Sequence, residues 1–74
     1  SWAQVVGDTL IDKATGKTVG RIVSIDETTI NTLLEVMTPE DEERLIPAST
    51  DLIVKIDAEK QTIAMHIPAG LLDL

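Results

Sequence analysis

The chain has 74 residues, a length that accommodates one small domain and leaves no room for a second. Its 13 acidic residues against six Lys and Arg give a net charge of −7, which disfavours direct binding to the phosphate backbone of a nucleic acid. The chain has no Cys for disulfides or thiolate metal sites, and its apolar runs are far shorter than the roughly 20 residues that span a bilayer, so we expect a cytoplasmic protein that does not enter the membrane.

Most of the chain alternates apolar and polar residues with a period of two, which is the pattern of a half-buried β-strand. The expected strands are Gln4–Asp12, Val19–Asp26, Thr32–Thr38, Arg44–Pro47, Ile53–Asp57 and Thr62–Ile67. The connections between them are short and contain turn residues. Because an open sheet of this size would leave its edges unpaired, the pattern predicts an all-β fold, a small six-stranded antiparallel barrel around an aliphatic core.

The last residues of the chain break this alternation. Leu71, Leu72 and Leu74 follow Gly70 at a spacing that fits a single helical turn. A chain terminus is usually polar and frayed unless something holds it. We therefore expect a short C-terminal helical turn whose leucines join the core and cover one open end of the barrel.

Two motifs that could carry chemistry have simpler explanations. Gly16-Lys17-Thr18 resembles the end of a phosphate-binding loop, but residue 11 is Ile where that loop needs Gly, and a strand follows where it needs a helix. A hairpin turn in which Gly16 takes a positive φ is the better interpretation. His66 is the only histidine and has no catalytic partners at a suitable spacing, so we expect it to be exposed. The sequence predicts no enzyme, no metal site and no cofactor.

Two features remain as candidates for partner binding. Glu40, Asp41, Glu42 and Glu43 form the densest run of charge in the chain. They lack the alternate spacing and the central Gly of a calcium loop, which leaves either a solvated loop or an acidic patch that meets a basic partner. Trp2 is the only aromatic residue, and it either braces the barrel or contacts a partner or another domain.

Several short segments also match a known family pattern. In the second half they are Leu45-Ile46-Pro47, Ile56-Asp57 and Pro68-Ala69-Gly70-Leu71-Leu72-Asp73. In the first half, with looser agreement, they are residues 2–7, 19–23 and 31–34. Together these segments resemble the PRC-barrel domain of the ribosome maturation factor RimM family, and the resemblance covers essentially the whole chain.

The resemblance implies a single PRC-barrel domain over residues 1–74, the C-terminal part of a longer ribosome assembly factor whose N-terminal domain precedes it. It implies a non-catalytic module that binds a ribosomal protein of the small-subunit head, acts on the immature small ribosomal subunit and supports 16S rRNA processing. The acidic balance is compatible with this partner because ribosomal proteins are strongly basic. We expect a monomer with little direct nucleic-acid binding. The alternative is a stand-alone PRC-barrel adaptor or a structural module of a membrane-associated complex.

Overall fold

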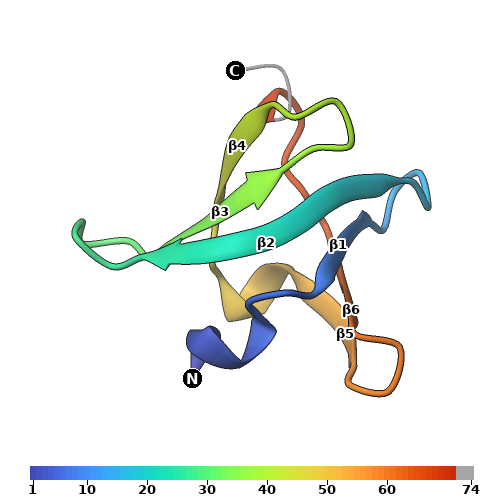
Figure 1. Ribbon diagram of the computed structural model, residues 1–74, viewed down its shortest axis with the longest axis horizontal. Coiled ribbons are helices and arrows are strands. Elements are labelled where there is room, and N and C mark those ends of the chain that lie inside the picture. Colours follow the sequence, from blue (N-terminus) through green and yellow to red (C-terminus); the bar gives the residue numbers. More distant parts are fainter. Residues whose placement is uncertain (72–74) are drawn as a thin grey trace.

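The computed structural model describes residues 1–71, which form six β-strands and two short 3-10 helices (Figure 1). In chain order the elements are η1 (Trp2–Val5), β1 (Thr9–Asp12), β2 (Thr18–Asp26), β3 (Leu33–Met37), β4 (Glu43–Pro47), η2 (Thr50–Leu52), β5 (Ile53–Asp57) and β6 (Thr62–Met65). The predicted all-β fold is confirmed. The predicted C-terminal helical turn falls mostly on residues 72–74, outside the described residues. Leu71, just before them, is half-buried, and its N–H donates to the Pro68 carbonyl at 3.3 Å.

The core is aliphatic, as the alternation predicts. On β3, Leu34 and Val36 are fully buried, while Leu33, Glu35 and Met37 between and beside them are only half-buried. Each strand contributes in this way except β5, whose Ile53 packs at the margin of the core. The buried apolar residues are Val5, Leu10, Val19, Ile22, Leu34, Val36, Ile46, Ile63 and Met65. Full burial of one such side chain contributes about 1.5 to 3 kcal/mol, so this cluster is the main source of stability.

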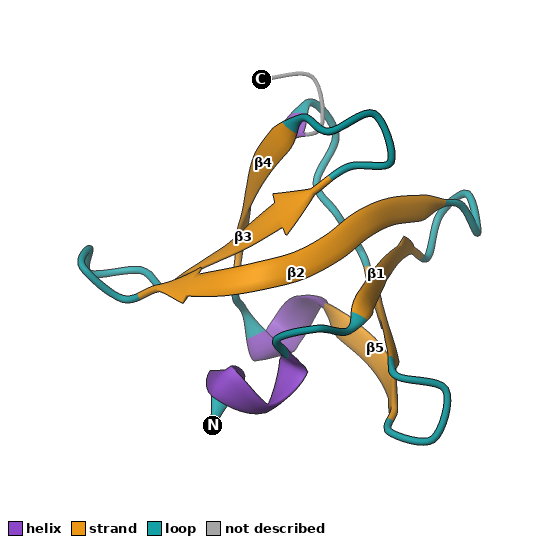
Figure 2. Ribbon diagram, viewed as in Figure 1, coloured by secondary structure: helices purple, strands orange, loops and turns teal. Residues whose placement is uncertain are grey.

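The sheet order is β4-β3-β2-β1-β6-β5, and the strands wrap around the core (Figure 2). Four of the strand pairs are antiparallel, but β1 and β6 run parallel, with Thr9 beside Thr62 and Asp12 beside Met65. The prediction of a wholly antiparallel barrel is therefore wrong for this pair.

The parallel pair arises because the chain does not reverse between β4 and β5. It turns a corner through residues 48–52, which include η2, and the β5–β6 hairpin then brings β6 alongside β1 in the same direction. The corner is tied down by the Ala48 N–H, which donates to the Thr32 carbonyl (2.9 Å), and by the His66 N–H, which donates to the Leu52 carbonyl (2.8 Å). Within residues 1–71 no ladder pairs β4 with β5, so this corner spans the gap between the two end strands.

The predicted first strand, Gln4–Asp12, is also corrected. Its first part is the 3-10 helix η1, and the strand proper begins only at Thr9. Gly7 lies between them with φ 95°, a left-handed conformation that ends the turn. The turn places Val5 in the core and leaves Val6 44% exposed. Two adjacent valines fit either a strand or a turn, so the pattern at this length could not separate the two.

Candidate functional site

The acidic run Glu40–Glu43 covers the tight turn that joins β3 to β4 and the first residue of β4. The Thr38 N–H donates to the Glu42 carbonyl at 2.8 Å, and the Asp41 N–H donates to the Thr38 carbonyl at 2.9 Å. Asp41 has a φ of 65°, in the left-handed region that Asp tolerates better than most residues. All four acidic side chains are exposed. The loop expected from the sequence is thus an ordered hairpin turn that presents four carboxylates to solvent.

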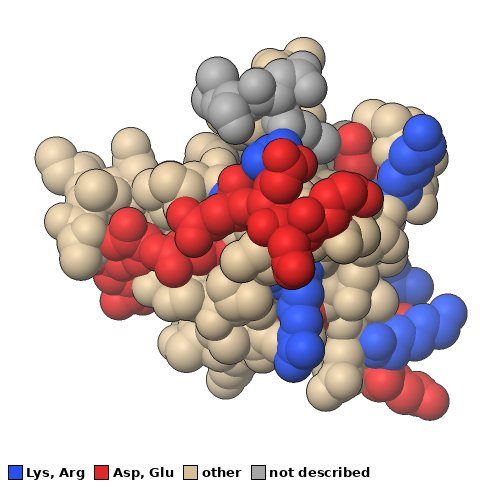
Figure 3. Space-filling view, turned by 45° about the horizontal axis from the view of Figure 1, so that its top comes forward, with Lys and Arg blue, Asp and Glu red and all other residues tan. Residues whose placement is uncertain are grey.

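Strand register extends this negative charge over the outer face of β2, β3 and β4. Glu35 points outward, because its neighbours Leu34 and Val36 point into the core, and it lies opposite Leu45 of β4. Asp26 of β2 lies on the same face. Figure 3 shows acidic side chains gathered in a band across this view of the molecule. We call the following carboxylates the acidic face: Asp26, Glu27, Glu35, Glu40, Asp41, Glu42 and Glu43.

The sequence segment that supplies the acidic face, residues 26–43, accounts for the whole net charge of the chain. Residues 26–43 hold seven of the 13 acidic residues and no Lys or Arg, whereas the other six acidic residues are matched by six Lys and Arg. Such a one-sided field speeds the approach of a positively charged surface and repels a phosphate backbone. Only residues 40–43 of this face form a run of charge in the sequence, whereas the other three carboxylates are evident only from the charge summed over residues 26–43.

Local hydrogen bonds adjust the charge at the two ends of the acidic face. Near the turn, Arg44 Nη2 lies 3.2 Å from Glu42 Oε1, and Arg44 Nη1 donates to the Glu43 carbonyl at 3.0 Å. At the end of β2, Asp26 Oδ1 accepts hydrogen bonds from the Thr28 hydroxyl (2.6 Å) and the Thr28 N–H (2.9 Å). These bonds lower the pKa of Asp26 below its ordinary value of 3.8. Asp26 therefore stays ionised even in mildly acidic solution.

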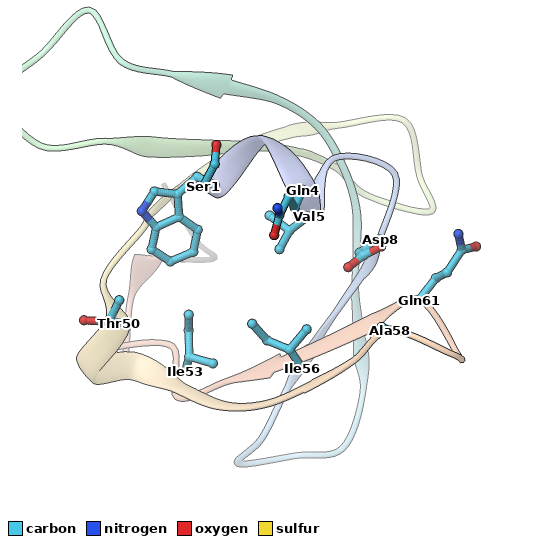
Figure 4. Close-up of a pocket in the computed structure, with 10 residues that line it drawn as sticks. Ser1, Gln4, Val5, Asp8, Thr50, Ile53, Ile56, Ala58 and Gln61 are labelled. Carbon is cyan, nitrogen blue, oxygen red and sulfur yellow. The ribbon is translucent and has the colours of Figure 1, made fainter.

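Trp2 lies in a different part of the molecule, at the wall of a pocket between η1 on one side and η2 with β5 on the other. The pocket has a volume of about 520 Å³. Figure 4 shows Val5 facing Ile53 and Ile56 across it. Trp2 is half-buried and packs against the core cluster, so it does brace the barrel. Whether it also contacts a partner, the other role weighed for it, stays a prediction.

Asp8 lines the same pocket and was not found from the sequence. With 9% of its surface exposed, it is the only buried charged residue in the described chain. Its main chain is held on both sides, because its N–H donates to the Val5 carbonyl (3.0 Å) and its carbonyl accepts from the Ile22 N–H (2.9 Å). No residue within 1–71 forms a hydrogen bond or salt bridge with its carboxylate. An Asp next to a Gly is typical of an exposed turn, so no local sequence pattern predicts that Asp8 is buried.

The two groups of candidate residues do not form one site. Figure 1 shows the N-terminus, and with it η1, at the opposite side of the molecule from the turn between β3 and β4. Consistent with this, none of residues 40–43 lines the pocket beside Trp2. The structure therefore has an acidic face and a separate, largely apolar pocket.

Gly16 and His66 have the structural roles that the sequence predicts. Gly16 takes a φ of 75° in the turn between β1 and β2, where its N–H donates to the Asp12 carbonyl at 2.7 Å. His66 is exposed. Throughout residues 1–71, no group of three His, Asp or Glu side chains is placed to bind a metal ion. Neither 3-10 helix, nor any other helix in this part of the chain, is long and apolar enough to cross a bilayer.

Comparison with known proteins gives a consistent result. The family described as RimM PRC barrel domain matches residues 2–71. The ribosome maturation factor RimM of Porphyromonas gingivalis is 42% identical over 74 residues, and that of Bacteroides thetaiotaomicron is 40% identical over 74 residues. Both alignments cover 100% of this chain but only 42% and 41% of the relatives, so the chain spans about two fifths of their length.

A solved structure agrees with the fold. The crystal structure of a 16S ribosomal RNA processing protein, RimM, from Pseudomonas aeruginosa superposes with a TM-score of 0.77 at 26% sequence identity. The superposition covers 93% of this chain and 44% of the Pseudomonas chain. The barrel described above is thus shared with a protein of the same family.

Proposed function

The chain belongs to the RimM PRC barrel domain family, and from this membership we propose that it is the binding module of a ribosome maturation factor. In this proposal it acts in the cytoplasm, as a monomer and without catalysis, on the immature small ribosomal subunit. Its role is to bind a basic ribosomal protein of the subunit head, as a chaperone would, and so to support processing of 16S rRNA.

The observation that carries this proposal is the confinement of the net charge to residues 26–43. Ribosomal proteins are strongly basic, so a face with seven carboxylates, of which Glu42 is paired with Arg44, attracts such a protein. The same field disfavours direct contact with rRNA, whose phosphates have the same sign. The module therefore reaches the ribosome through protein and not through nucleic acid.

The proposed contacts are Glu40, Asp41, Glu42 and Glu43, with Trp2 at a second position. The four acidic residues are exposed and their backbone is ordered by hydrogen bonds of the turn, so little backbone entropy is lost when a partner binds them. Trp2 is half-buried, which leaves part of the indole ring available for contact.

The test is the rate of association with purified ribosomal proteins of the small-subunit head, measured by surface plasmon resonance between 50 and about 300 mM salt. We expect the association rate constant to fall steeply as salt rises. The double variant Glu40→Gln/Glu43→Gln should lower it by roughly threefold or more at the lowest salt.

The matched control is Asp51→Asn/Glu59→Gln, which removes two exposed negative charges outside the acidic face. This control changes the net charge by the same amount as Glu40→Gln/Glu43→Gln. If the position of the charge matters, the control should lower the association rate constant clearly less. An association rate that is insensitive to salt, or an equal loss in the two double variants, would contradict the role given to the acidic face.

A further inference from the structure

The Asp8 carboxylate has no hydrogen-bond or salt-bridge partner among the described residues, although the residue is nine-tenths buried, and its oxygens stay accessible to solvent. Removal of a carboxylate from water is unfavourable unless a cation or several donors compensate it. Yet no described residue pairs with the Asp8 side chain, and the residue is nine-tenths buried. Main-chain hydrogen bonds on both sides of Asp8 fix its backbone beside the pocket. The group is therefore held ready for a positively charged ligand.

The pocket that Asp8 lines has the chemistry of an amphipathic cation site. Figure 4 shows the Asp8 carboxylate at one end of the pocket, with Ile53 and Ile56 along one wall and Val5 on the other. Trp2 is also part of the lining. Apolar walls suit the methylene stem of a long side chain, an indole ring attracts a cation, and a carboxylate binds the charged head.

We propose that this pocket receives a Lys or Arg side chain from a protein partner, with Asp8 binding the cationic head. The partner's identity, a basic protein, rests on the function proposed above, but the chemistry of the pocket does not. A metal ion is disfavoured as occupant because no cluster of three potential ligands exists within residues 1–71. The pocket lies away from the acidic face, so it supplies a second and separate contact for the same basic partner.

Titration with short peptides tests this directly. The probes are three capped pentapeptides, Gly-Gly-X-Gly-Gly, in which X is Arg, Lys or citrulline, the uncharged analogue of Arg. Binding is followed by the Trp2 fluorescence of the chain and by ¹⁵N chemical shifts of the amides of Asp8 and Ile56. We expect at least one of the two cationic peptides to shift these signals. The ratio of the dissociation constants of the Arg and Lys peptides then identifies the preferred head group. The citrulline peptide should bind at least about tenfold more weakly, because it lacks the charge.

The key variant is Asp8→Asn, which keeps the shape of the side chain and removes its charge. It should weaken binding of the preferred peptide by about tenfold or more. It should leave the urea midpoint unchanged or higher, because the charge that it removes has no partner among the described residues. Glu59→Gln makes the same change in net charge at an exposed residue that belongs neither to the acidic face nor to the pocket lining, and it should leave peptide binding unchanged.

A second variant keeps the test valid if Asp8→Asn fails to fold. Ile56 is 51% exposed and lines the pocket, so Ile56→Lys is compatible with folding and supplies a tethered cation. It should prevent binding of the cationic peptides. The proposal is overturned if the citrulline peptide binds as well as the preferred cationic peptide, if neither cationic peptide shifts the pocket amides at millimolar concentration, or if Ile56→Lys binds them like the unchanged chain. Because these readouts do not involve a ribosomal protein, their failure would not affect the role of the acidic face.

Discussion

Replacement of Gly20 by Ala is expected to destabilise the fold strongly, because β2 passes against the main chain of β3 at this residue. A Cβ atom on Gly20 would lie 2.2 Å from the Met37 carbonyl oxygen and 2.9 Å from Val36 Cγ1. The oxygen belongs to the backbone, which cannot move away without disturbing the ladder that pairs Arg21 with Met37. Overpacking of a tight site destabilises by roughly 1 to 3 kcal/mol, and we expect Gly20→Ala to reach the upper end, about 3 kcal/mol.

A loss of this size is a large part of the roughly 4 to 11 kcal/mol expected for a 74-residue chain. Urea unfolding followed by circular dichroism and by Trp2 fluorescence measures it, with a lower midpoint and an unchanged slope. Gly16→Ala is the matched control, because Gly16 has a φ of 75° but nothing within 4 Å of the added Cβ. Gly16→Ala should therefore lower the free energy of unfolding only by the strain of a left-handed Ala residue, about 1 to 2 kcal/mol. A smaller loss for Gly20→Ala than for Gly16→Ala would refute the close approach of the two strands.

Three further predictions test the turn, the core and the charge of the acidic face. Asp41→Gly should raise the free energy of unfolding by about 0.5 to 1 kcal/mol, because Gly adopts the φ of 65° without strain; a lower urea midpoint would contradict this turn geometry. Leu34→Ala empties a fully buried position and should lower the free energy of unfolding by roughly 2 to 5 kcal/mol, whereas Leu45→Ala, at 45% exposure, should lower it by less than about 1 kcal/mol. Equal urea midpoints for these two variants would count against the inward face assigned to β3. The Thr28 hydrogen bonds lower the pKa of Asp26, so their contribution to stability is complete above the ordinary pKa of 3.8 and is lost as pH falls through the lower folded value. Thr28→Val keeps the N–H and removes the hydroxyl, so NMR titration should show a higher pKa for Asp26; an unchanged pKa would mean that the hydroxyl does not bind the carboxylate.

The candidate sites could be predicted from the sequence only where the residues are adjacent in the chain. Glu40–Glu43 are consecutive acidic residues, so the sequence alone identifies them as a charged segment. Glu35 joins that run only through the pairing of β3 with β4, and Asp26 joins it only through the pairing of β2 with β3. Asp8 has no local pattern at all, because its burial depends on η1, β1 and β2 meeting around it.

The sequence by itself determined that the chain is a small all-β domain with an aliphatic core, since strand alternation is a local property that a period of two reveals. It also determined the sign of the surface charge. Only the tertiary structure decided the direction of β6 beside β1, because that direction follows from the corner through η2, and no residue in β6 encodes it. The tertiary structure likewise decided that the negative charge gathers on one face and that Asp8, a largely buried residue, lines a separate pocket, since both depend on contacts between residues far apart in the chain.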